Sequence, residues 1–415
     1  MCIVNPRNAV DDTMLVSFVP MTLIDDGFSN HFTFEERAWG NVKSGFTHFR
    51  EGDVGLAKIT PCLENRKSVV FRGLTNGIGA GTTELHIFRP FCNDTILPEY
   101  ILWYFKSERF ITGCIGAFSG AVGQQRVGKD YFANTYFPVP PFSEQQRIVA
   151  AIESAFAVID EVERNKADLQ SAVTAAKSKI LSLAIQGKLV PQDPNDEPAS
   201  VLLERIRAER SALANAGKIK DSKGKKAQPI SVDNSYYAWL PESWVVCYLS
   251  EIGEIVGGGT PSTSEPSYWD GNIPWITPAD LSGYSEKHIS SGSRKITKRG
   301  LSESSAKLMP AGSVLFSSRA PIGYCVISAC EVCTNQGFKS VVPFIADMNE
   351  WIYHYLRAQI EEIRSRASGT TFKEISGAEM GNTVISIPPL TEQKRIITAI
   401  EMMFSQLDGI AEMLV

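Results

Sequence analysis

The sequence lacks long apolar runs and any paired pattern of cysteines. No apolar stretch reaches the roughly eighteen residues that cross a bilayer as a helix. The N-terminal MCIVNPRNAVDD also lacks the basic and apolar regions of a signal peptide. The eight cysteines are scattered, which in a chain of 415 residues indicates reduced thiols rather than a disulfide scaffold. We therefore expect a cytoplasmic protein with no membrane contact.

The chain also has fewer basic than acidic residues. The 41 Lys and Arg residues are outnumbered by 46 Asp and Glu residues, which gives a formal net charge of -5. This balance excludes proteins that coat nucleic acid through a uniformly basic surface, so any nucleic-acid binding must depend on local basic patches. The length exceeds what one hydrophobic core usually fills, and it predicts two or more domains.

No catalytic or metal-binding motif is complete. Residues 123–130, GQQRVGKD, have the glycine and lysine spacing of a phosphate-binding loop, but Asp130 stands where a Ser or Thr would hold magnesium. Cys330 and Cys333 have CxxC spacing, yet no second pair and no paired histidines complete a zinc site. The adenine-methyltransferase motif NPP(Y/F) is absent. We expect no catalytic residues, no metal and no bound cofactor in this chain.

The chain contains a long-period duplication. Residues 140–160, PPFSEQQRIVAAIESAFAVID, align without a gap on residues 388–408, PPLTEQKRIITAIEMMFSQLD, and 11 of the 21 positions are identical. The period is much longer than that of a solenoid repeat, so each copy should have a core of its own. Weaker echoes lie upstream in the same order: GDVGLAKITP at 52–61 with GSVLFSSRAP at 312–321, and FSG at 118–120 with ASG at 367–369.

Each copy ends in a predicted helix with apolar residues at alternating steps of four and three. We expect helices at about 144–186 and from about 391 onward, with Ser143 and Thr391 as N-caps. The first would be roughly 60 Å long and could act as a spacer. The heptad spacing predicts that each helix is the other's partner; alternatively, each helix packs on its own domain. The seam residues are Ile148, Ile152, Ile159, Val162, Leu169, Val173, Ile180, Leu183, Ile396, Ile400, Met403, Leu407 and Ile410.

The rest of each copy is rich in short apolar or β-branched runs separated by Gly, Pro, Asn and Ser, which is typical of mainly β folds. Each copy also has one aromatic helical stretch, PEYILWYFKSERF at 98–110 and MNEWIYHYLRAQIEEIRSRA at 348–367, whose rings we expect in the core. We predict four segments: a mainly β domain at 1–141, a helical spacer with a basic linker at 142–235, a second mainly β domain at 236–389, and a C-terminal spacer helix at 390–415.

Several motifs from both halves of the chain occur in a fixed order. They are FVPM at 18–21, GFTHFREGDVGLAKITPCLENRKS at 45–68, GIGAGTTELHIFRP at 77–90, PPFSEQQRIVAAIE at 140–153, KILSLAIQGKLVPQDPNDEPASVLLERIRAER at 179–210, WLPESW at 239–244, GGGTPSTSEPSYWDGNIPWITPADL at 257–281 and TNQGFKS at 334–340. Together these motifs resemble those of type I restriction-modification specificity subunits. The resemblance implies an α+β fold with two mainly β target-recognition domains, separated by long antiparallel coiled-coil helices and related by a pseudo-two-fold internal repeat.

The resemblance further implies a non-catalytic subunit. Each recognition domain would read one half of an interrupted site in double-stranded DNA, and the helices would dock two methyltransferase subunits. Those subunits would methylate adenine with S-adenosylmethionine, and restriction subunits would use ATP and magnesium to translocate and cut unmethylated DNA. Two alternatives stay open: a stand-alone DNA methyltransferase or nuclease, and a protein-binding scaffold with duplicated domains.

Two departures from the repeat are visible. The first copy has no counterpart of WLPESWVVCYLSEIGEIVGGGT at 239–260, so we expect the first recognition domain to lack its opening strand. The second helix stops at Val415, well short of the first, which weakens the expected pairing at its far end.

Candidate DNA contacts are polar residues in predicted loops. Arg, Lys, Asn and Gln side chains read base edges, whereas Ser, Thr and backbone N–H groups hold phosphates. In the first domain the candidates are Lys58, Thr60, Asn65, Arg66, Lys67, Ser119, Gln124, Gln125 and Arg126. In the second they are Ser318, Arg319, Thr334, Asn335, Gln336, Lys339, Ser368, Thr370, Thr371 and Lys373.

Overall fold

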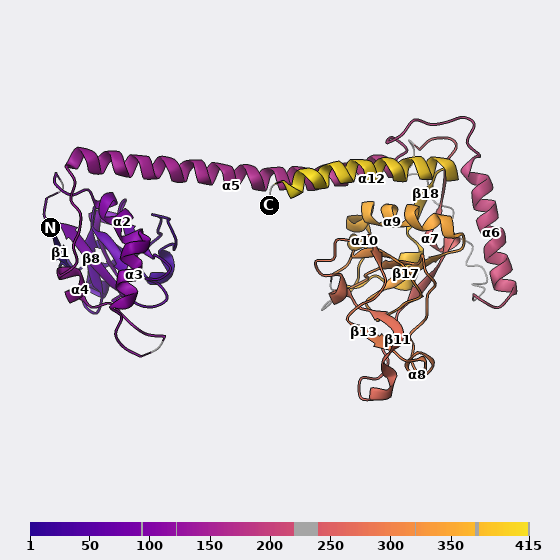
Figure 1. Ribbon diagram of the computed structural model, residues 1–415, viewed down its shortest axis with the longest axis horizontal. Coiled ribbons are helices and arrows are strands. Elements are labelled where there is room, and N and C mark those ends of the chain that lie inside the picture. Colours follow the sequence, from indigo (N-terminus) through magenta and orange to yellow (C-terminus); the bar gives the residue numbers. More distant parts are fainter. Residues whose placement is uncertain (93, 122, 220–239, 320, 370–372, 414–415) are drawn as a thin grey trace. The chain divides into compact units, whose positions relative to one another are not determined.

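The computed structural model describes residues 1–415 except 93, 122, 220–239, 320, 370–372 and 414–415 (Figure 1). The chain forms two compact units: unit 1, Met1–Arg164, and unit 2, Asn165–Val415. The boundary between them lies inside the 44-residue helix α5, Phe142–Ile185. No helix in the described part of the chain is both long and apolar enough for a membrane crossing.

Unit 1 is built on two four-stranded sheets. One has the strand order β1-β8-β5-β6 and is antiparallel throughout. The other has the order β3-β2-β7-β4, with β2 parallel to β7. The strands are β1 Cys2–Val4, β2 Leu15–Val19, β3 Glu35–Ala38, β4 Thr47–Arg50, β5 Val54–Ala57, β6 Ser68–Val70, β7 Ile78–Gly81 and β8 Leu85–Pro90; the helices are η1 Met21–Leu23, α1 Trp39–Val42, η2 Thr75–Gly77, α2 Pro98–Lys106, α3 Glu108–Gly116 and α4 Lys129–Ala133.

The core of unit 1 depends on close aromatic packing. The rings of Phe49 and Phe71 are stacked with centroids 3.7 Å apart. Glycines make room for them, because a Cβ atom at Gly79 would lie 2.0 Å from the Phe49 ring and one at Gly55 would lie 2.8 Å from the Phe71 ring. The neighbouring strands β5 and β8 are buried along their whole length.

The described residues of unit 2 form three sheets. They have the orders β10-β17-β14-β15-β12, β13-β11-β16 and β18-β9. The strands are β9 Val245–Tyr248, β10 Gly253–Gly257, β11 Trp269–Ile276, β12 His288–Ile289, β13 Arg294–Ile296, β14 Val314–Phe316, β15 Cys325–Ser328, β16 Cys333–Thr334, β17 Lys339–Pro343 and β18 Val384–Ile387. The helices are α6 Ala199–Asn215, α7 Leu249–Ile252, η3 Pro266–Tyr268, η4 Pro278–Leu281, α8 Lys298–Ser302, η5 Ala346–Met348, α9 Asn349–Ala358, α10 Ile360–Ser365, α11 Gly377–Gly381 and α12 Leu390–Glu412.

The aromatic helical stretches form α2 and α9. Trp351 and Tyr355 of α9 are fully buried, and Tyr100 and Phe105 of α2 are buried as well. The prediction that these rings lie in the core is therefore confirmed for these four residues. Trp103 lies at the edge, where its ring stacks on Phe156 of α5 with centroids 5.2 Å apart.

The duplication extends to individual hydrogen bonds. Tyr100 Oη donates to the carbonyl of Pro138 (3.2 Å), and Trp351 Nε1 donates to the carbonyl of Ser386 (2.9 Å) at the equivalent place in unit 2. Likewise, the side-chain amides of the aligned residues Gln145 and Gln393 donate to the carbonyls of Pro140 (3.0 Å) and Pro388 (2.9 Å). In each copy, one bond therefore ties the aromatic helix, α2 or α9, to the segment before the long helix. The other ties the first turn of the long helix, α5 or α12, to a proline just before that helix.

The two long helices begin one residue before the predicted N-caps. α5 starts at Phe142 and α12 at Leu390, and the N-cap of α12 is Pro389, which offers no side-chain acceptor. The prediction of Ser143 and Thr391 as caps is wrong. The prolines account for this, since their fixed φ lets the chain enter the helix without a cap, and Thr391 hydrogen-bonds Asp196 instead.

Helices α5 and α12 pair antiparallel within unit 2. Lys177 forms an ion pair with Asp408 and lies 5.3 Å from the centroid of the Phe404 ring. At the other end of the contact, Ser386 Oγ, just before α12, donates to the carbonyl of Ile185 (3.0 Å). The C-terminal part of α5 therefore runs against α12 in the opposite direction.

The seam is buried only along part of α5. Val173 is buried, and Ile180 and Leu183 are half-buried. Ile148 and Ile152 are half-buried in unit 1. Between these stretches Ile159, Val162 and Leu169 are exposed by 49%, 60% and 40%, so the predicted pairing with α12 holds only from Val173 onward.

The seam residues of α12 divide in the same way. Ile396 and Ile400 are fully buried in the core of unit 2, whereas Met403 and Leu407 are half-buried and Ile410 is exposed. The first two residues share their cluster with α9 as well as with α5. The two readings of the sequence, pairing of the helices and packing of each on its own domain, therefore both apply to α12.

Candidate nucleic-acid interface

The loop at 119–126 gathers most of the candidate residues of unit 1. Its end pairs with the segment that follows β5, because the Thr60 N–H donates to the Gln125 carbonyl (3.0 Å) and the Val127 N–H donates to the Lys58 carbonyl (3.0 Å). Ser119 and Arg126 close the loop with reciprocal backbone bonds of 3.1 and 2.9 Å. The structure thus brings Lys58, Thr60, Ser119, Gln124, Gln125 and Arg126 together.

An ion pair fixes this loop to Glu84, the residue just before β8. The guanidinium of Arg126 donates to both carboxylate oxygens of Glu84, Nε to Oε2 and Nη2 to Oε1, each at 2.9 Å. The hydrogen bonds from Arg126 lower the pKa of Glu84. Arg126 is therefore oriented by its partner, while the neighbouring Gln124 is exposed.

The other three candidates of unit 1 lie apart from this loop. Lys67 Nζ donates to the carbonyl of Ile24 (2.7 Å), and Arg66 Nε donates to the carbonyl of Lys106 (3.1 Å). Both cationic side chains therefore donate hydrogen bonds to backbone carbonyls of unit 1 itself. Asn65 is exposed beside them.

Unit 2 contains an equivalent loop between Ser368 and Glu374. Ser368 and Glu374 exchange backbone bonds of 3.1 and 2.9 Å, and the Ile375 N–H donates to the Ser318 carbonyl (3.0 Å), as Val127 does to Lys58. Arg319 pairs with Glu374 through an isolated bridge. Thr370 and Thr371 lie outside the described residues, and Lys373 is exposed.

The ion pair of this second loop has the opposite polarity. Lys339 Nζ in β17 donates to Glu374 Oε1 (2.9 Å), so the loop supplies the anion and the strand the cation. In unit 1 the loop supplies the cation, Arg126, and the residue just before β8 supplies the anion, Glu84. The same framework therefore presents different charges in the two units.

The remaining candidates of unit 2 surround the turn at 334–337. Asn335 Oδ1 accepts the Gly337 N–H (2.8 Å), and Gln336 Oε1 accepts the Thr260 hydroxyl (2.6 Å). Gln336 is exposed, whereas the Thr334 side chain is buried and its hydroxyl has no hydrogen-bond partner. Buried Ser318 donates its hydroxyl to the carbonyl of Gly337 (3.2 Å).

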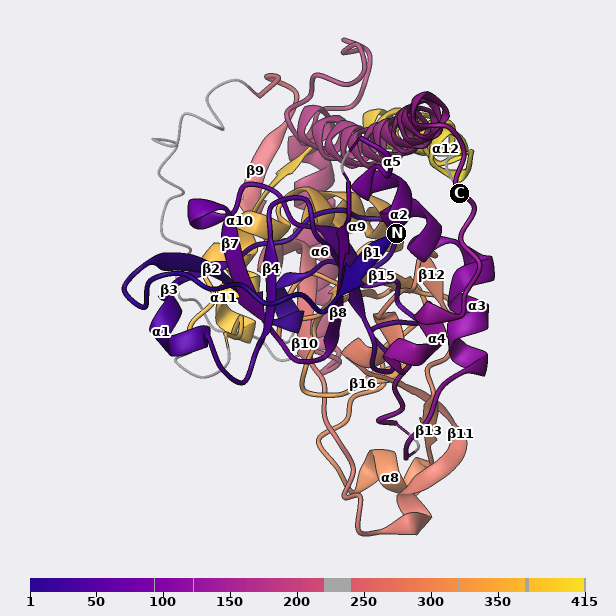
Figure 2. The same cartoon turned by 90° about the vertical axis from the view of Figure 1, so that its left-hand side faces the viewer.

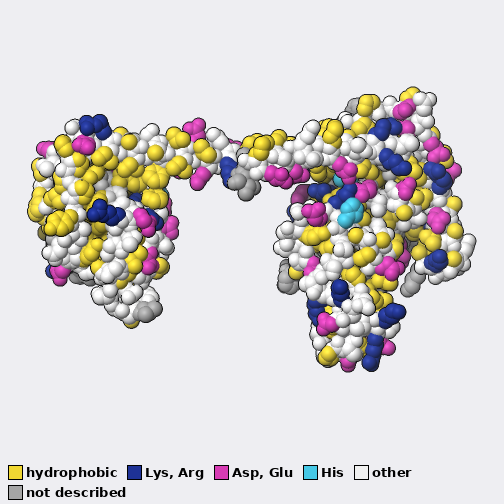
Figure 3. All heavy atoms as spheres, in the orientation of Figure 1, with side chains coloured by type: hydrophobic (Ala, Val, Ile, Leu, Met, Phe, Trp, Pro, Cys, Tyr) yellow, Lys and Arg dark blue, Asp and Glu magenta, His cyan; other side chains and the backbone are white. Residues whose placement is uncertain are grey.

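A basic arm beside this turn was missed in the sequence. The arm consists of β11, β13, η3 and α8, and it projects from the rest of unit 2 (Figures 1 and 2). The Arg294 guanidinium lies 3.5 Å from the centroid of the Trp269 ring, which meets Trp275 edge to face at 5.1 Å. Dark blue Lys and Arg atoms gather on this part of unit 2 in Figure 3. The exposed basic residues of the arm are Arg294, Lys295, Lys298 and Arg299.

The arm is attached to the polar turn by very close backbone contacts. A Cβ atom at Gly258 would lie 1.9 Å from the carbonyl oxygen of Asn335, so only glycine fits there. The Gly259 N–H donates to the Thr334 carbonyl (2.9 Å), and Trp275 Nε1 donates to the Gly259 carbonyl (2.8 Å). The signals for this surface in the sequence are GGGT at 257–260 and the basic run RKITKR at 294–299.

One group in the described part of the chain has donor atoms close enough to hold a metal ion. Single donor atoms of Glu350, His354 and Glu401 lie within 4.8 Å of one another. Lys287 already supplies a cation here: its ammonium donates to Glu350 Oε2 (2.9 Å) and to Glu401. Burial lowers the pKa of His354 to about 3. The group is an internal ion-pair network.

Comparison with known proteins matches these features to one family. Residues 241–411 fit the type I restriction modification DNA specificity domain. The EcoAI specificity subunit of Escherichia coli is 40% identical over 297 residues, which cover 61% of this chain and 50% of the relative. The EcoEI specificity subunit of Escherichia coli is 38% identical over 308 residues, covering 64% and 51%. In both comparisons the chain is similar to type I specificity subunits.

Solved structures show the same fold. The HsdS subunit from Thermoanaerobacter tengcongensis aligns with this chain at a TM-score of 0.58 and 19% identity, over 97% of this chain and 86% of that one. A chain from a type I R-M system aligns at 0.66 and 21%, over 97% and 87%. The predicted fold class, α+β with mainly β domains and long helices, is confirmed. The chain spans about half the length of the curated specificity subunits that it matches.

Proposed function

We propose that this chain is the non-catalytic DNA-reading subunit of a type I restriction-modification enzyme. Each unit reads one half of an interrupted site in double-stranded DNA. Adenine methylation with S-adenosylmethionine belongs to methyltransferase subunits, and ATP- and magnesium-dependent translocation and cleavage belong to restriction subunits. The specificity domain at 241–411 supports DNA reading, and the repeat supports two readers.

The observation that carries the two-part site is the reversed ion pair. Arg126–Glu84 and Glu374–Lys339 occupy equivalent points of one framework with exchanged charges. A cationic and an anionic loop present different hydrogen-bonding partners to a base edge, since Arg matches guanine acceptors and Glu matches the cytosine amino donor. Two units with the same backbone and different loops would therefore select different half-sites.

Within unit 2 the candidate surface combines base reading with phosphate binding. Gln336, Arg319 and Lys373 lie at the polar turn or loop, where amide and guanidinium groups suit base edges. The basic arm adds four exposed cations that suit phosphates, whose neutralisation makes binding depend on salt. This local arrangement fits a chain whose net charge of -5 disfavours uniform coating of DNA.

The exposed middle of α5 is the proposed docking face for methyltransferase subunits. Val158, Ile159 and Val162 are exposed by 57%, 49% and 60%, and they form an apolar stripe on one helix. Such a stripe is costly to leave in water and is typical of an interaction site. Amphipathic helices of a partner subunit would cover it.

The test is selection of duplexes from a random library by the chain together with its methyltransferase subunits. We expect an interrupted motif with two unequal halves. A double variant of the arm, Arg294→Ala with Arg299→Ala, should weaken binding to all duplexes and lower the salt slope by about one per lost phosphate contact. The control is Arg205→Ala, an exposed cation of α6 paired with Glu197. Adenine methylation or DNA cleavage by the chain alone would overturn the proposal.

A further inference from the structure

The ion-pair network of unit 2 borders an imidazole that takes no part in it. His354 lies on α9, and only 3% of its surface is exposed. Neither of its ring nitrogens has a hydrogen-bond partner in the described part of the chain. Buried polar groups are nearly always hydrogen-bonded in folded proteins, so this unpaired ring is a candidate ligand for a metal ion.

Two carboxylates from different helices lie close to this imidazole. Single donor atoms of His354, Glu350 and Glu401 lie within 4.8 Å of one another. Glu350 and His354 are four residues apart and share one face of α9, whereas Glu401 comes from α12. In β12, His288 Nε2 lies 3.6 Å from Glu350 Oε1. The set combines imidazole nitrogen with carboxylate oxygen, the donor types that suit Zn²⁺.

The His354 ring is in the protonation state that metal binding requires. Burial, followed by the charges of Arg357 and Lys287, lowers the pKa of His354 to about 3. At neutral pH the ring is therefore uncharged, and one nitrogen keeps the lone pair that a metal ion accepts. A protonated ring would repel the ion.

The two carboxylates can reach metal-binding distance through their own rotations. Zn²⁺ holds nitrogen and oxygen donors at about 2.0–2.2 Å in a tetrahedral arrangement, which places the donors about 3.4 Å from one another. The side chains of Glu350 and Glu401 are exposed by 26% and 52%. Because neither is enclosed by the core, small rotations of these long side chains bring their oxygens to an ion bound at His354.

Lys287 neutralises only part of this group. Its ammonium donates to Glu350 Oε2 (2.9 Å) and to Glu401. One ammonium between two carboxylates leaves an excess of negative charge, and it leaves His354 without a partner. A divalent cation would balance both carboxylates and would bind the imidazole as well. The Lys287 side chain is 25% exposed, so its ammonium can move out to water.

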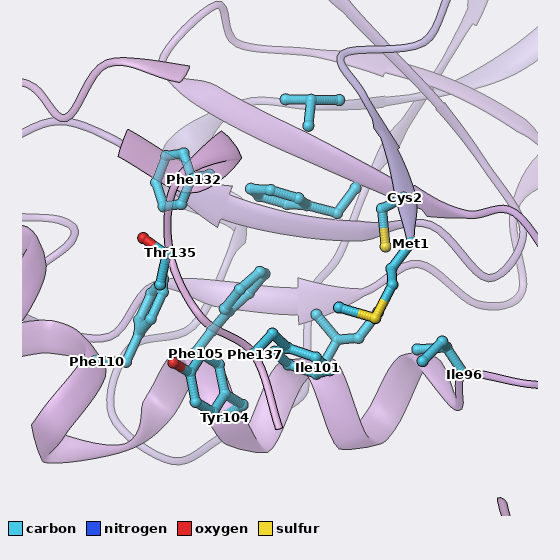
Figure 4. A pocket seen from close by; sticks show the side chains of 12 residues that line it. Met1, Cys2, Ile96, Ile101, Tyr104, Phe105, Phe110, Phe132, Thr135 and Phe137 are labelled. Carbon is cyan, nitrogen blue, oxygen red and sulfur yellow. The ribbon is translucent and has the colours of Figure 1, made fainter. Parts of the chain in front are cut away.

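Unit 1 has no such donor set at the equivalent place. With Tyr100 aligned on Trp351, Trp103 stands in α2 where α9 has His354. The Trp103 ring stacks on the ring of Phe156. Elsewhere α2 borders an apolar pocket of about 320 Å³ (Figure 4), and none of the 12 residues that line it has a carboxylate or an imidazole. The set is therefore a property of unit 2 and not of the repeated framework.

We propose that His354, Glu350 and Glu401 form a binding site for one Zn²⁺ ion, which displaces the ammonium of Lys287. The ion ties α9 to α12 and so fixes the C-terminal helix on unit 2. None of its ligands is among the candidate DNA contacts, so the site is separate from DNA reading. It reverses the expectation of no metal from the sequence, because the third ligand lies in a distant helix and completes no local motif.

The experiment titrates Co²⁺, a spectroscopic substitute for Zn²⁺, into the full chain after metals have been removed, with a phosphine reductant present. We expect one Co²⁺ per chain with visible d–d absorption. The first equivalent should show no sulfur-to-cobalt charge-transfer band, which would mark binding by the free cysteines. Zn²⁺ should displace Co²⁺ and raise the Tm of the chain, because it binds only the folded site.

Two substitutions should change the affinity for Zn²⁺ in opposite directions. Glu401→Gln removes a ligand at an exposed position and should weaken binding at least about tenfold, since loss of an outer-shell partner already costs that much. Lys287→Met removes the competing ammonium and should tighten binding at least about threefold, because no charge-assisted hydrogen bonds have to break. The matched control is Glu361→Gln, which removes a carboxylate of α10 that is 82% exposed and should leave the affinity unchanged.

His354→Leu keeps an apolar side chain in the core and should abolish the d–d absorption. Circular dichroism verifies that each variant is folded, and Glu401→Gln decides the question if His354→Leu is not. The proposal is wrong if no Co²⁺ binds, if the first equivalent shows the thiolate band, or if Glu401→Gln and Glu361→Gln have equal affinity. An affinity that Lys287→Met leaves unchanged would also overturn it, because the ammonium and the metal would then not share one site.

Discussion

Arg126 and Glu374 occupy the same point in two copies of one loop, yet they have opposite charges and opposite partners. Each is held by a residue in or next to the adjacent strand, Glu84 or Lys339, so the loops proposed to contact DNA are oriented in advance. A side chain ordered in advance loses less freedom on binding. The exposed neighbours Gln124 and Lys373 are then the residues most open to base edges.

At this scale the account predicts a dependence on pH. The pKa of Glu84 is lowered in the folded chain by the hydrogen bonds from Arg126, so the pair contributes stability above the pKa of Glu84 in the unfolded chain. That contribution is lost as the pH falls through the lowered pKa. Hydrogen exchange of the loop amides should therefore accelerate in acid, and Glu84→Gln should reproduce the acceleration at neutral pH.

The effect should be modest, less than about 1 kcal/mol, because the pair is partly exposed to water. Glu99→Gln breaks a comparable ion pair with Arg72 on α2 and serves as the control, since it should leave the 119–126 loop unchanged. Equal protection of the loop in Glu84→Gln and in the unaltered chain would contradict the role given to this pair.

Individual site residues were harder to predict than elements. Lys67 and Arg66 are residue types that often contact DNA, but here they donate to backbone carbonyls of their own domain. Whether a cationic side chain points to solvent or to such carbonyls depends on the fold. The arm with Trp269 and Arg294 was missed because its glycines and tryptophans are far apart in sequence and meet only in three dimensions. The local sequence pattern predicted where loops lie along the chain. It could not predict which side chains come together on one surface.

At the scale of elements, the heptad spacing predicted α5 within two residues at its start and one at its end. It could not show which part of the seam is covered, because spacing is the same whether a partner is present or not. Contact with α12 covers α5 near Val173 to Ile185, and the stripe at Val158 to Val162 is open. An exposed apolar stripe on a long helix predicts a separate partner.

Val162→Glu tests that partner. The side chain is 60% exposed, so the free energy of unfolding of the chain alone should change by less than about 0.5 kcal/mol. Affinity for the methyltransferase subunits should fall, because the substitution would bury a charge in an apolar contact. The measurements are chemical denaturation of the chain alone and sedimentation of the mixture; undiminished assembly would show that the stripe is not the docking face.

Helix length offers a second test at the same scale. Removal of residues 163–169 deletes one heptad, keeps the register of the seam and shortens α5 by about 10 Å at 1.5 Å per residue. Phe156 and the stripe at Val158 to Val162 stay in place. At 3.4 Å per base pair, the gap between half-sites should shrink by about three base pairs, provided that α5 sets the spacing. Motif mapping with the shortened chain measures this; an unchanged gap would remove α5 from that role.

At the scale of the whole molecule, the chain is two units that repeat one framework with different loops. The length and duplication of the sequence predicted two domains, and the contacts define two compact units. The contact boundary lies within α5, whereas the predicted boundary at 141 lies at its start, because the helix packs on unit 1 through Phe156 beyond that point. Pattern in the sequence locates elements, and packing decides to which unit they belong.

The central claim is that each unit reads its own half of one DNA site. Its most direct test is a map of methylated adenines in cells that express the methyltransferase subunits with either the original chain or a chain whose residues 236–389 come from another family member. The account predicts an interrupted motif in both cases, with one half unchanged and the other half replaced. A motif that changes in both halves, or in neither, would contradict it.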